Sequence, residues 1–132
     1  MAFTPPFPLL CAACCISSVI CANVSLFTLI SYLRLVTTQA ILLEIGNALS
    51  KQKYRSAAIQ LLESLEADPN IEIVPLTNEL YNAAFQLFKS RQDKEWGLVD
   101  CISFLVMQNR AITEALTADD HFNQAGFRAL LK

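Results

Sequence analysis

Two acidic side chains lie at the ends of apolar segments that we expect to be buried. Asp100 opens the largely apolar run from Cys101 to Met107, and Asp119 closes the run from Ala111 to Ala118. A carboxylate at the edge of a core costs free energy unless it is paired or binds a metal ion. Two such acids at the ends of adjacent elements therefore favour a functional site over solvated surface.

A third acid, Glu44, lies in a segment with helical spacing. Thr37 or Thr38 is suited to cap a helix that runs through Leu49, and Glu44 falls on or beside the apolar face of that helix. Taken alone, a glutamate there is more often a rim residue with its stem buried and its carboxylate in water. Its role as a site residue depends on the other two acids.

A cluster of Glu44, Asp100 and Asp119 would need a counter-charge. Three converging carboxylates raise one another's pKa values, and a divalent cation removes that repulsion. Carboxylate oxygens suit hard ions, so the cluster indicates Mg²⁺ or Mn²⁺ and not zinc. Such an ion would activate a water molecule and polarise a phosphodiester.

The residues around these acids resemble those of a known family. Glu44 lies in Leu-Leu-Glu-Ile-Gly-Asn-Ala-Leu, Asp100 in Trp-Gly-Leu-Val-Asp-Cys-Ile-Ser-Phe, and Asp119 in Thr-Ala-Asp-Asp-His-Phe. In this order and spacing the motifs resemble the PIN-domain ribonucleases, in particular the VapC-like toxin branch, from about Val36 to Leu131. The resemblance implies catalytic and metal-binding roles for the three acids in metal-dependent RNA cleavage. It also implies an RNA substrate, a small antitoxin partner and a homodimer.

The front of the chain departs from the family pattern. PIN domains carry their first catalytic Asp at the end of a first strand near the N-terminus, whereas no Asp or Glu precedes Glu44 here. Asn23, a neutral amide, is the nearest substitute in residues 1–35. We therefore expect an impaired nuclease; the alternative is a non-catalytic PIN remnant that acts as a binding protein.

Four further polar residues are candidates for supporting roles. Ser103 lies one turn after Asp100 and could hydrogen-bond a carboxylate or a phosphate, or be an ordinary small helix residue. Asp93 could support the metal ligands without binding the ion itself, but it fits a solvated loop better. Asp120 competes with Asp119 for the metal, and the Thr-Ala-Asp pattern favours Asp119. His121 could act near the metal, although we expect it mainly to position the last helix.

The pattern of elements predicts a PIN-like three-layer α/β/α fold with a central parallel sheet, its N-terminal strand aberrant or replaced. Besides the helix ending at Leu49, the predicted elements are helices at Tyr54–Ala67, from Thr77, at Asp100–Gln108 and at Phe122–Leu131, and strands at Ile71–Leu76 and Ile112–Ala118. In such a sheet ligands bind outside the carboxyl ends of the strands. Asp119, at the end of the last predicted strand, lies at this edge.

Composition divides the chain into residues 1–35, a hydrophobic cysteine-rich segment, and residues 36–132, the PIN-like domain. The 132 residues suffice for one domain, and a net charge of −2 excludes a generally basic nucleic-acid binder. Residues Leu9–Leu33 carry no charge, which leaves three interpretations: a membrane anchor, a buried first strand and helix around Ile16–Leu26, or a start that is not native to the fold. We expect a cytoplasmic protein; the alternative is a small protein anchored in the membrane through this segment.

Overall fold

The computed structural model describes Leu9–Leu10 and residues 34–131. These residues form helices and short strands, and every strand pairing among them is parallel. The elements are β1 (Leu9–Leu10), β2 (Leu35–Thr38), α3 (Gln39–Ala48), α4 (Gln52–Ala67), β3 (Ile71–Val74), α5 (Asn78–Ser90), α6 (Leu98–Asn109), β4 (Glu114–Ala115), α7 (Asp120–Gln124) and β5 (Arg128–Ala129).

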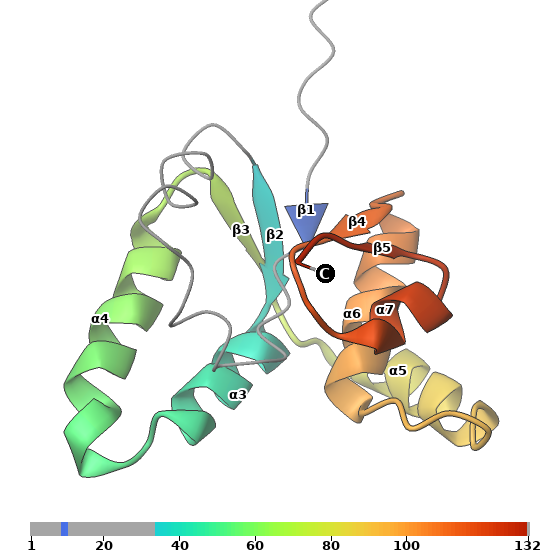
Figure 1. Ribbon diagram of the computed structural model, residues 1–132, viewed down its shortest axis with the longest axis horizontal. Coiled ribbons are helices and arrows are strands. Elements are labelled where there is room, and N and C mark those ends of the chain that lie inside the picture. The colour runs from blue at the N-terminus through green and yellow to red at the C-terminus, as the bar shows by residue number, and fades with distance from the viewer. Residues whose placement is uncertain (1–8, 11–33, 132) are drawn as a thin grey trace, which may run out of the picture.

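The sheet has the strand order β3-β2-β1-β4-β5. From β1 in the centre, the sheet adds β2 and β3 on one side and then β4 and β5 on the other. Figure 1 shows α3 and α4 on the side of β3, and α5, α6 and α7 on the side of β4 and β5. This confirms the predicted α/β/α fold with its central parallel sheet. The strand order reverses beside β1, and such a switch point is where open parallel sheets bind ligands.

Strand β2 was not predicted from the sequence, because its four residues do not alternate between buried and exposed positions. Leu35, Val36, Thr37 and Thr38 are all buried, as is typical of a parallel strand covered on both faces. Thr38 ends the strand and caps α3, since its Oγ1 accepts a hydrogen bond from the Ile41 N–H at 3.3 Å. The predicted cap is confirmed, and the direct passage from strand to helix fixes where Glu44 lies.

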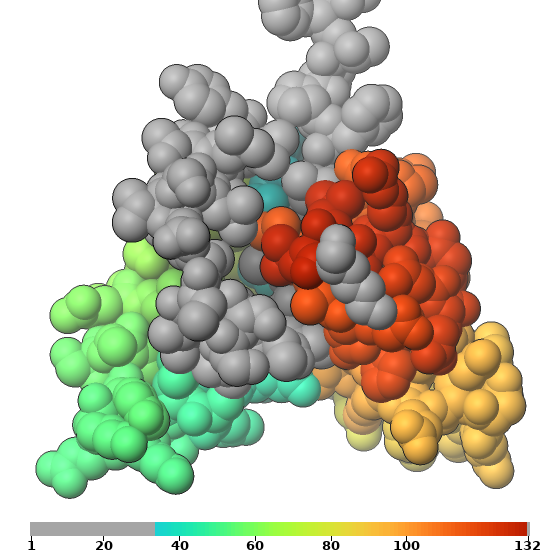
Figure 2. Space-filling model, viewed as in Figure 1, coloured from blue at the N-terminus to red at the C-terminus, as the bar shows by residue number. Residues whose placement is uncertain are grey.

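Helix α6 is the centre of the core. Its residues from Asp100 to Phe104 are all buried, as are Val106 and Met107. The Phe104 ring packs edge-on against Trp96 and Phe122, each with its ring centroid 5.0 Å away. In Figure 2 the red C-terminal residues pack directly against the yellow and orange residues around the end of α5. The aromatic cluster thus holds the starts of α6 and α7 together.

Two predicted elements near the C-terminus are wrong in extent. The strand predicted at Ile112–Ala118 pairs only at Glu114 and Ala115, because the backbone then turns and the Thr117 N–H donates to the Ala115 carbonyl at 3.0 Å. The helix predicted at Phe122–Leu131 ends at Gln124, because Gly126 adopts a left-handed φ of 92° that terminates it. The chain then forms β5, parallel to β4.

The centre of the sheet is occupied by Leu9 and Leu10, which pair with β2 on one side and β4 on the other. At these two residues the chain is a strand, so a continuous helix over Leu9–Leu33 is wrong at its start. The segment Ile16–Leu26 lies outside the described residues. Within the described part of the chain, none of the helices has the length and apolar character needed to cross a membrane.

Candidate functional site

Asp100 lies at the third position of α6, where its carboxylate also serves the helix. Oδ2 accepts a hydrogen bond from the Gly97 N–H at 2.8 Å, so the carboxylate satisfies the backbone of the N-cap residue. Asp100 is only 6% exposed. The free N–H groups at a helix start and the positive end of its dipole favour an anion at this position. The fold therefore tolerates this buried charge and holds it in one orientation.

Asp119 lies at the start of α7 and is its N-cap. Its Oδ1 accepts a hydrogen bond from the His121 N–H at 2.9 Å, and its own N–H donates to the buried Thr117 Oγ1 at 3.0 Å. The predicted place of Asp119 after a strand is confirmed, with three residues between β4 and the acid. These hydrogen bonds fix the short connection from β4 to α7 and, with it, the carboxylate.

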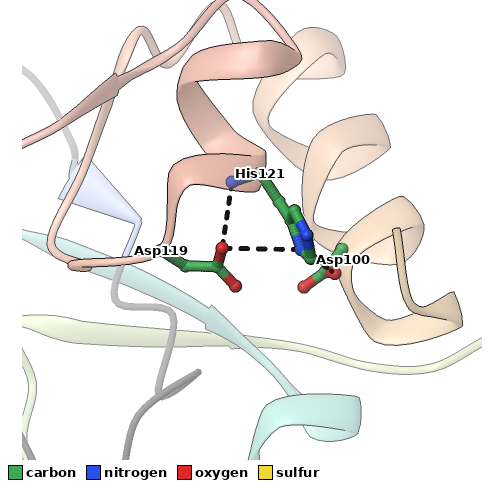
Figure 3. A group of neighbouring side chains, drawn as sticks. All are labelled: Asp100, Asp119 and His121. Atoms are coloured by element: carbon green, nitrogen blue, oxygen red, sulfur yellow. Dashed lines mark hydrogen bonds and ion pairs between the residues drawn. The ribbon is translucent and has the colours of Figure 1, made fainter. Parts of the chain in front are cut away.

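The His121 imidazole joins the two acids. Its Nδ1 lies 3.2 Å from Asp100 Oδ2 and 3.4 Å from Asp119 Oδ1. Figure 3 shows the three side chains converging from α6 and from the start of α7. One ligand atom from each residue lies within 4.8 Å of the others, close enough for a shared metal ion. Sequence reasoning gave His121 a packing role, and its proximity to Asp119 in the chain was the signal that could have indicated more.

Glu44 approaches the group from α3. It is half-buried, and its pKa is raised above 4.5, first by burial and second by the charge of Asp100. Glu44 is not within the 4.8 Å group formed by Asp100, Asp119 and His121. An ion bound by Asp100 and Asp119 would offset the unfavourable interaction between Glu44 and Asp100.

The other candidates lie differently. Ser103 is buried in α6, in the same helix as Asp100. Asp93 is exposed and forms an ion pair with Arg91 at 2.9 Å, which lowers its pKa through the hydrogen bond to the guanidinium. Asp120 is exposed and accepts hydrogen bonds from the amides of Asn123 and Gln124. Only His121 among the four supporting candidates joins the two aspartates within the 4.8 Å group of described residues.

The donor atoms suit a divalent ion bound mainly by oxygen. In an octahedral shell with bonds of about 2.1 Å, neighbouring ligand atoms lie about 3.0 Å apart. The distances of 3.2 and 3.4 Å between the imidazole nitrogen and the carboxylate oxygens are close to that spacing. The site could thus hold one ion with only small side-chain movements.

The family's first acid has no counterpart in the sequence. Strand β1 ends at Leu10, and the next residue is Cys11. Because the carboxyl ends of parallel strands meet at one edge of a sheet, an acid directly after this central strand would lie closest to the switch point. The sequence has no such acid at this position.

Comparisons with known proteins agree with the fold. The sequence model of the PIN-domain family matches residues 22–128 of the chain. Solved structures similar to the chain include VapC20 of Mycobacterium tuberculosis, a Sarcin-Ricin loop cleaving toxin, with a TM-score of 0.67 and 24% identity over 73% of each chain. No curated protein sequence matches. The resemblance carried by the motifs around Glu44, Asp100 and Asp119 is therefore confirmed, and the chain belongs to the PIN-domain family.

Proposed function

We propose that the chain is a metal-dependent endoribonuclease of toxin type whose activity is weakened by the missing first acid. The observation that carries the proposal is the convergence of Asp100 and Asp119, from two separate helix starts, on the His121 ring nitrogen. Family membership supports ribonuclease chemistry at this position. The VapC20 fold supports the toxin type.

In this proposal Asp100, Asp119 and Glu44 hold a Mg²⁺ or Mn²⁺ ion. When bound, the ion supplies a water of lowered pKa and polarises the scissile phosphate. Asp100 and Asp119 contribute oxygens whose orientation is fixed by the Gly97 and His121 N–H groups. The positive charge of the ion would lower the pKa of Glu44, which burial and the charge of Asp100 raise.

Weak activity follows from the ligand count. An ion that lacks one charged ligand is held less tightly, and its water is positioned less well. Displacement of a reacting group by about 1 Å can cost about a hundredfold in rate. The specific alternative is a PIN remnant that binds RNA or protein without cleavage, and the absence of any acid before Glu44 favours it.

The partners follow from the same proposal. The substrate is RNA, and a small antitoxin protein would restrain the enzyme, as the VapC-like resemblance implies. A homodimer remains a prediction of that resemblance, as does the division of the chain at residue 35. We propose a cytoplasmic location, because an enzyme of the toxin type would act on the RNA of its own cell. With a net charge of −2, RNA binding must depend on the metal and on local contacts.

The test is cleavage of structured RNAs, including a Sarcin-Ricin loop hairpin, by the purified full chain. Weak cleavage in Mn²⁺ or Mg²⁺, abolished by chelator and by Asp100→Asn or Asp119→Asn, is expected. Asp120→Asn removes the same charge one residue away and should leave cleavage intact. Cleavage that persists in chelator, or survives both site substitutions, would refute the proposal. No cleavage under any condition, with RNA still bound, would favour the non-catalytic alternative.

A further inference from the structure

The His121 ring nitrogen lies close to both aspartate carboxylates, where a metal ligand could lie. It lies 3.2 Å from an oxygen of Asp100 and 3.4 Å from an oxygen of Asp119. A single nitrogen at this distance from two carboxylates has the spacing of a third ligand around a shared ion. The imidazole side chain is 27% exposed, so the ring is partly accessible to solvent and is not fully buried in the core.

The backbone restricts where this ring can go. The His121 N–H donates to Asp119 Oδ1 at 2.9 Å, so the residue is tied to Asp119 through its main chain as well as its ring. His121 is also the second residue of α7, and Phe122 beside it is fully buried against Phe104. The imidazole is therefore held near both carboxylates by the fold of the helix start.

The remaining donors leave room for such a ligand. No acid precedes Glu44 in the sequence, so the oxygen ligands available from this family's pattern are one fewer than usual. A neutral imidazole would complete the shell without adding to the repulsion among the acids. Imidazole nitrogen is a poor ligand for Mg²⁺, which prefers oxygen, and a better one for transition-metal ions.

We infer that His121 is a metal ligand, and that the site consequently prefers Mn²⁺ to Mg²⁺. The inference rests on the proposed metal site and adds to it a nitrogen ligand and a preference for Mn²⁺ over Mg²⁺. The competing role is purely structural: the imidazole would donate a hydrogen bond to Asp100 and keep α7 against α6. The two roles differ in the contacts of a bound ion, because only a ligand places its nitrogen in direct contact with the metal.

The chain offers a clean spectroscopic test because His121 is its only histidine. Full-length protein without a histidine tag is loaded with one equivalent of Mn²⁺, and pulsed electron paramagnetic resonance is used to detect coupling to ¹⁴N. The inference predicts imidazole nitrogen coupling in the unaltered protein and its loss in His121→Asn. The amide of that variant can still donate a hydrogen bond near the position of Nδ1, so the local structure has a substitute donor.

Binding titrations with each ion give the second readout. Even partners that only orient a ligand change metal affinity by about 10–100-fold, so His121→Asn should weaken Mn²⁺ binding by at least about tenfold. Mg²⁺ binding should change by less than about threefold, because imidazole contributes little to that ion. Asp120→Asn is the control and should leave the ratio of the two affinities unchanged.

The outcomes separate this inference from the proposed function. Stoichiometric Mn²⁺ binding without nitrogen coupling, or equal losses for both ions in His121→Asn, would overturn the ligand role and leave the acidic site standing. Failure of the unaltered protein to bind Mn²⁺ at all would overturn the site itself. If His121→Asn does not fold, the coupling measured in the unaltered protein still decides.

Discussion

Asp119→Asn separates the two roles of this residue, helix cap and metal ligand. The asparagine side-chain oxygen can still accept the hydrogen bond that Asp119 Oδ1 accepts from the His121 N–H at 2.9 Å. Asn and Asp are about equally good N-caps, so the free energy of unfolding of the metal-free protein should change by less than about 0.5 kcal/mol. Asp119→Ala removes the cap as well and should cost about 1 kcal/mol.

The effect of metal should differ much more. At a free metal concentration one hundred times Kd, binding stabilises the folded state by about 2.7 kcal/mol. If Asp119→Asn weakens the site about a hundredfold, the same metal concentration adds only about 0.4 kcal/mol. For a domain of this size the difference of about 2.3 kcal/mol corresponds to about 7 °C in the metal-induced rise of Tm.

The assay is thermal unfolding of the unaltered protein, Asp119→Asn, Asp119→Ala and Asp120→Asn, each with Mn²⁺ and with chelator. The two Asp119 variants should lose the metal-induced rise, and Asp120→Asn should retain it. The reasoning is refuted if Asp119→Asn keeps the full rise, or if the loss in Asp120→Asn is equally large. A rise absent from the unaltered protein at every metal concentration would show that no such site exists.

Three further changes have expected outcomes. Burial, and then the charge of Asp100, raise the pKa of Glu44, so the folded state binds the Glu44 proton more tightly than the unfolded state does. The free energy of unfolding therefore falls as pH rises from about 4.5 through the raised pKa of the folded state. Glu44→Gln should therefore stabilise the metal-free protein at pH 7 and have little effect below pH ~4, as urea unfolding across that range would show; equal stability at pH 7 would contradict this. Cys11→Asp places an acid directly after β1 and should raise Mn²⁺ affinity and RNA cleavage together, and unchanged values for both would count against a role for the missing acid. Phe104→Ala removes the centre of the aromatic cluster and should lower the free energy of unfolding by about 3–5 kcal/mol in urea titrations, with a change under 1 kcal/mol inconsistent with its packing.

Local signals in the sequence predicted much of the first half of the domain. Thr38 and Thr77 cap α3 and α5 as expected, because a threonine before an apolar helical pattern satisfies free N–H groups with its hydroxyl. The family motifs also brought Asp100 and Asp119 into one site. Their meeting depends on α6 and α7 packing together, which periodicity alone does not determine.

The C-terminal elements depended on features that a simple pattern hides. Apolar residues from Phe122 to Leu131 suggest one helix, but Gly126 interrupts it in a left-handed conformation, and β5 follows. Gly126 was a readable stop signal. The nearness of His121 to Asp100 could not be read in the same way, because it joins positions 21 residues apart and arises only from tertiary packing.

The shared ion is tested most directly by a crystal structure of the full chain with Mn²⁺, located by anomalous scattering. We expect a single strong anomalous peak about 2.0–2.6 Å from carboxylate oxygens of Asp100 and Asp119, with Glu44 turned toward the same ion. A fully occupied Mn²⁺ elsewhere, with no metal between Asp100 and Asp119, would contradict a metal-dependent site at these residues.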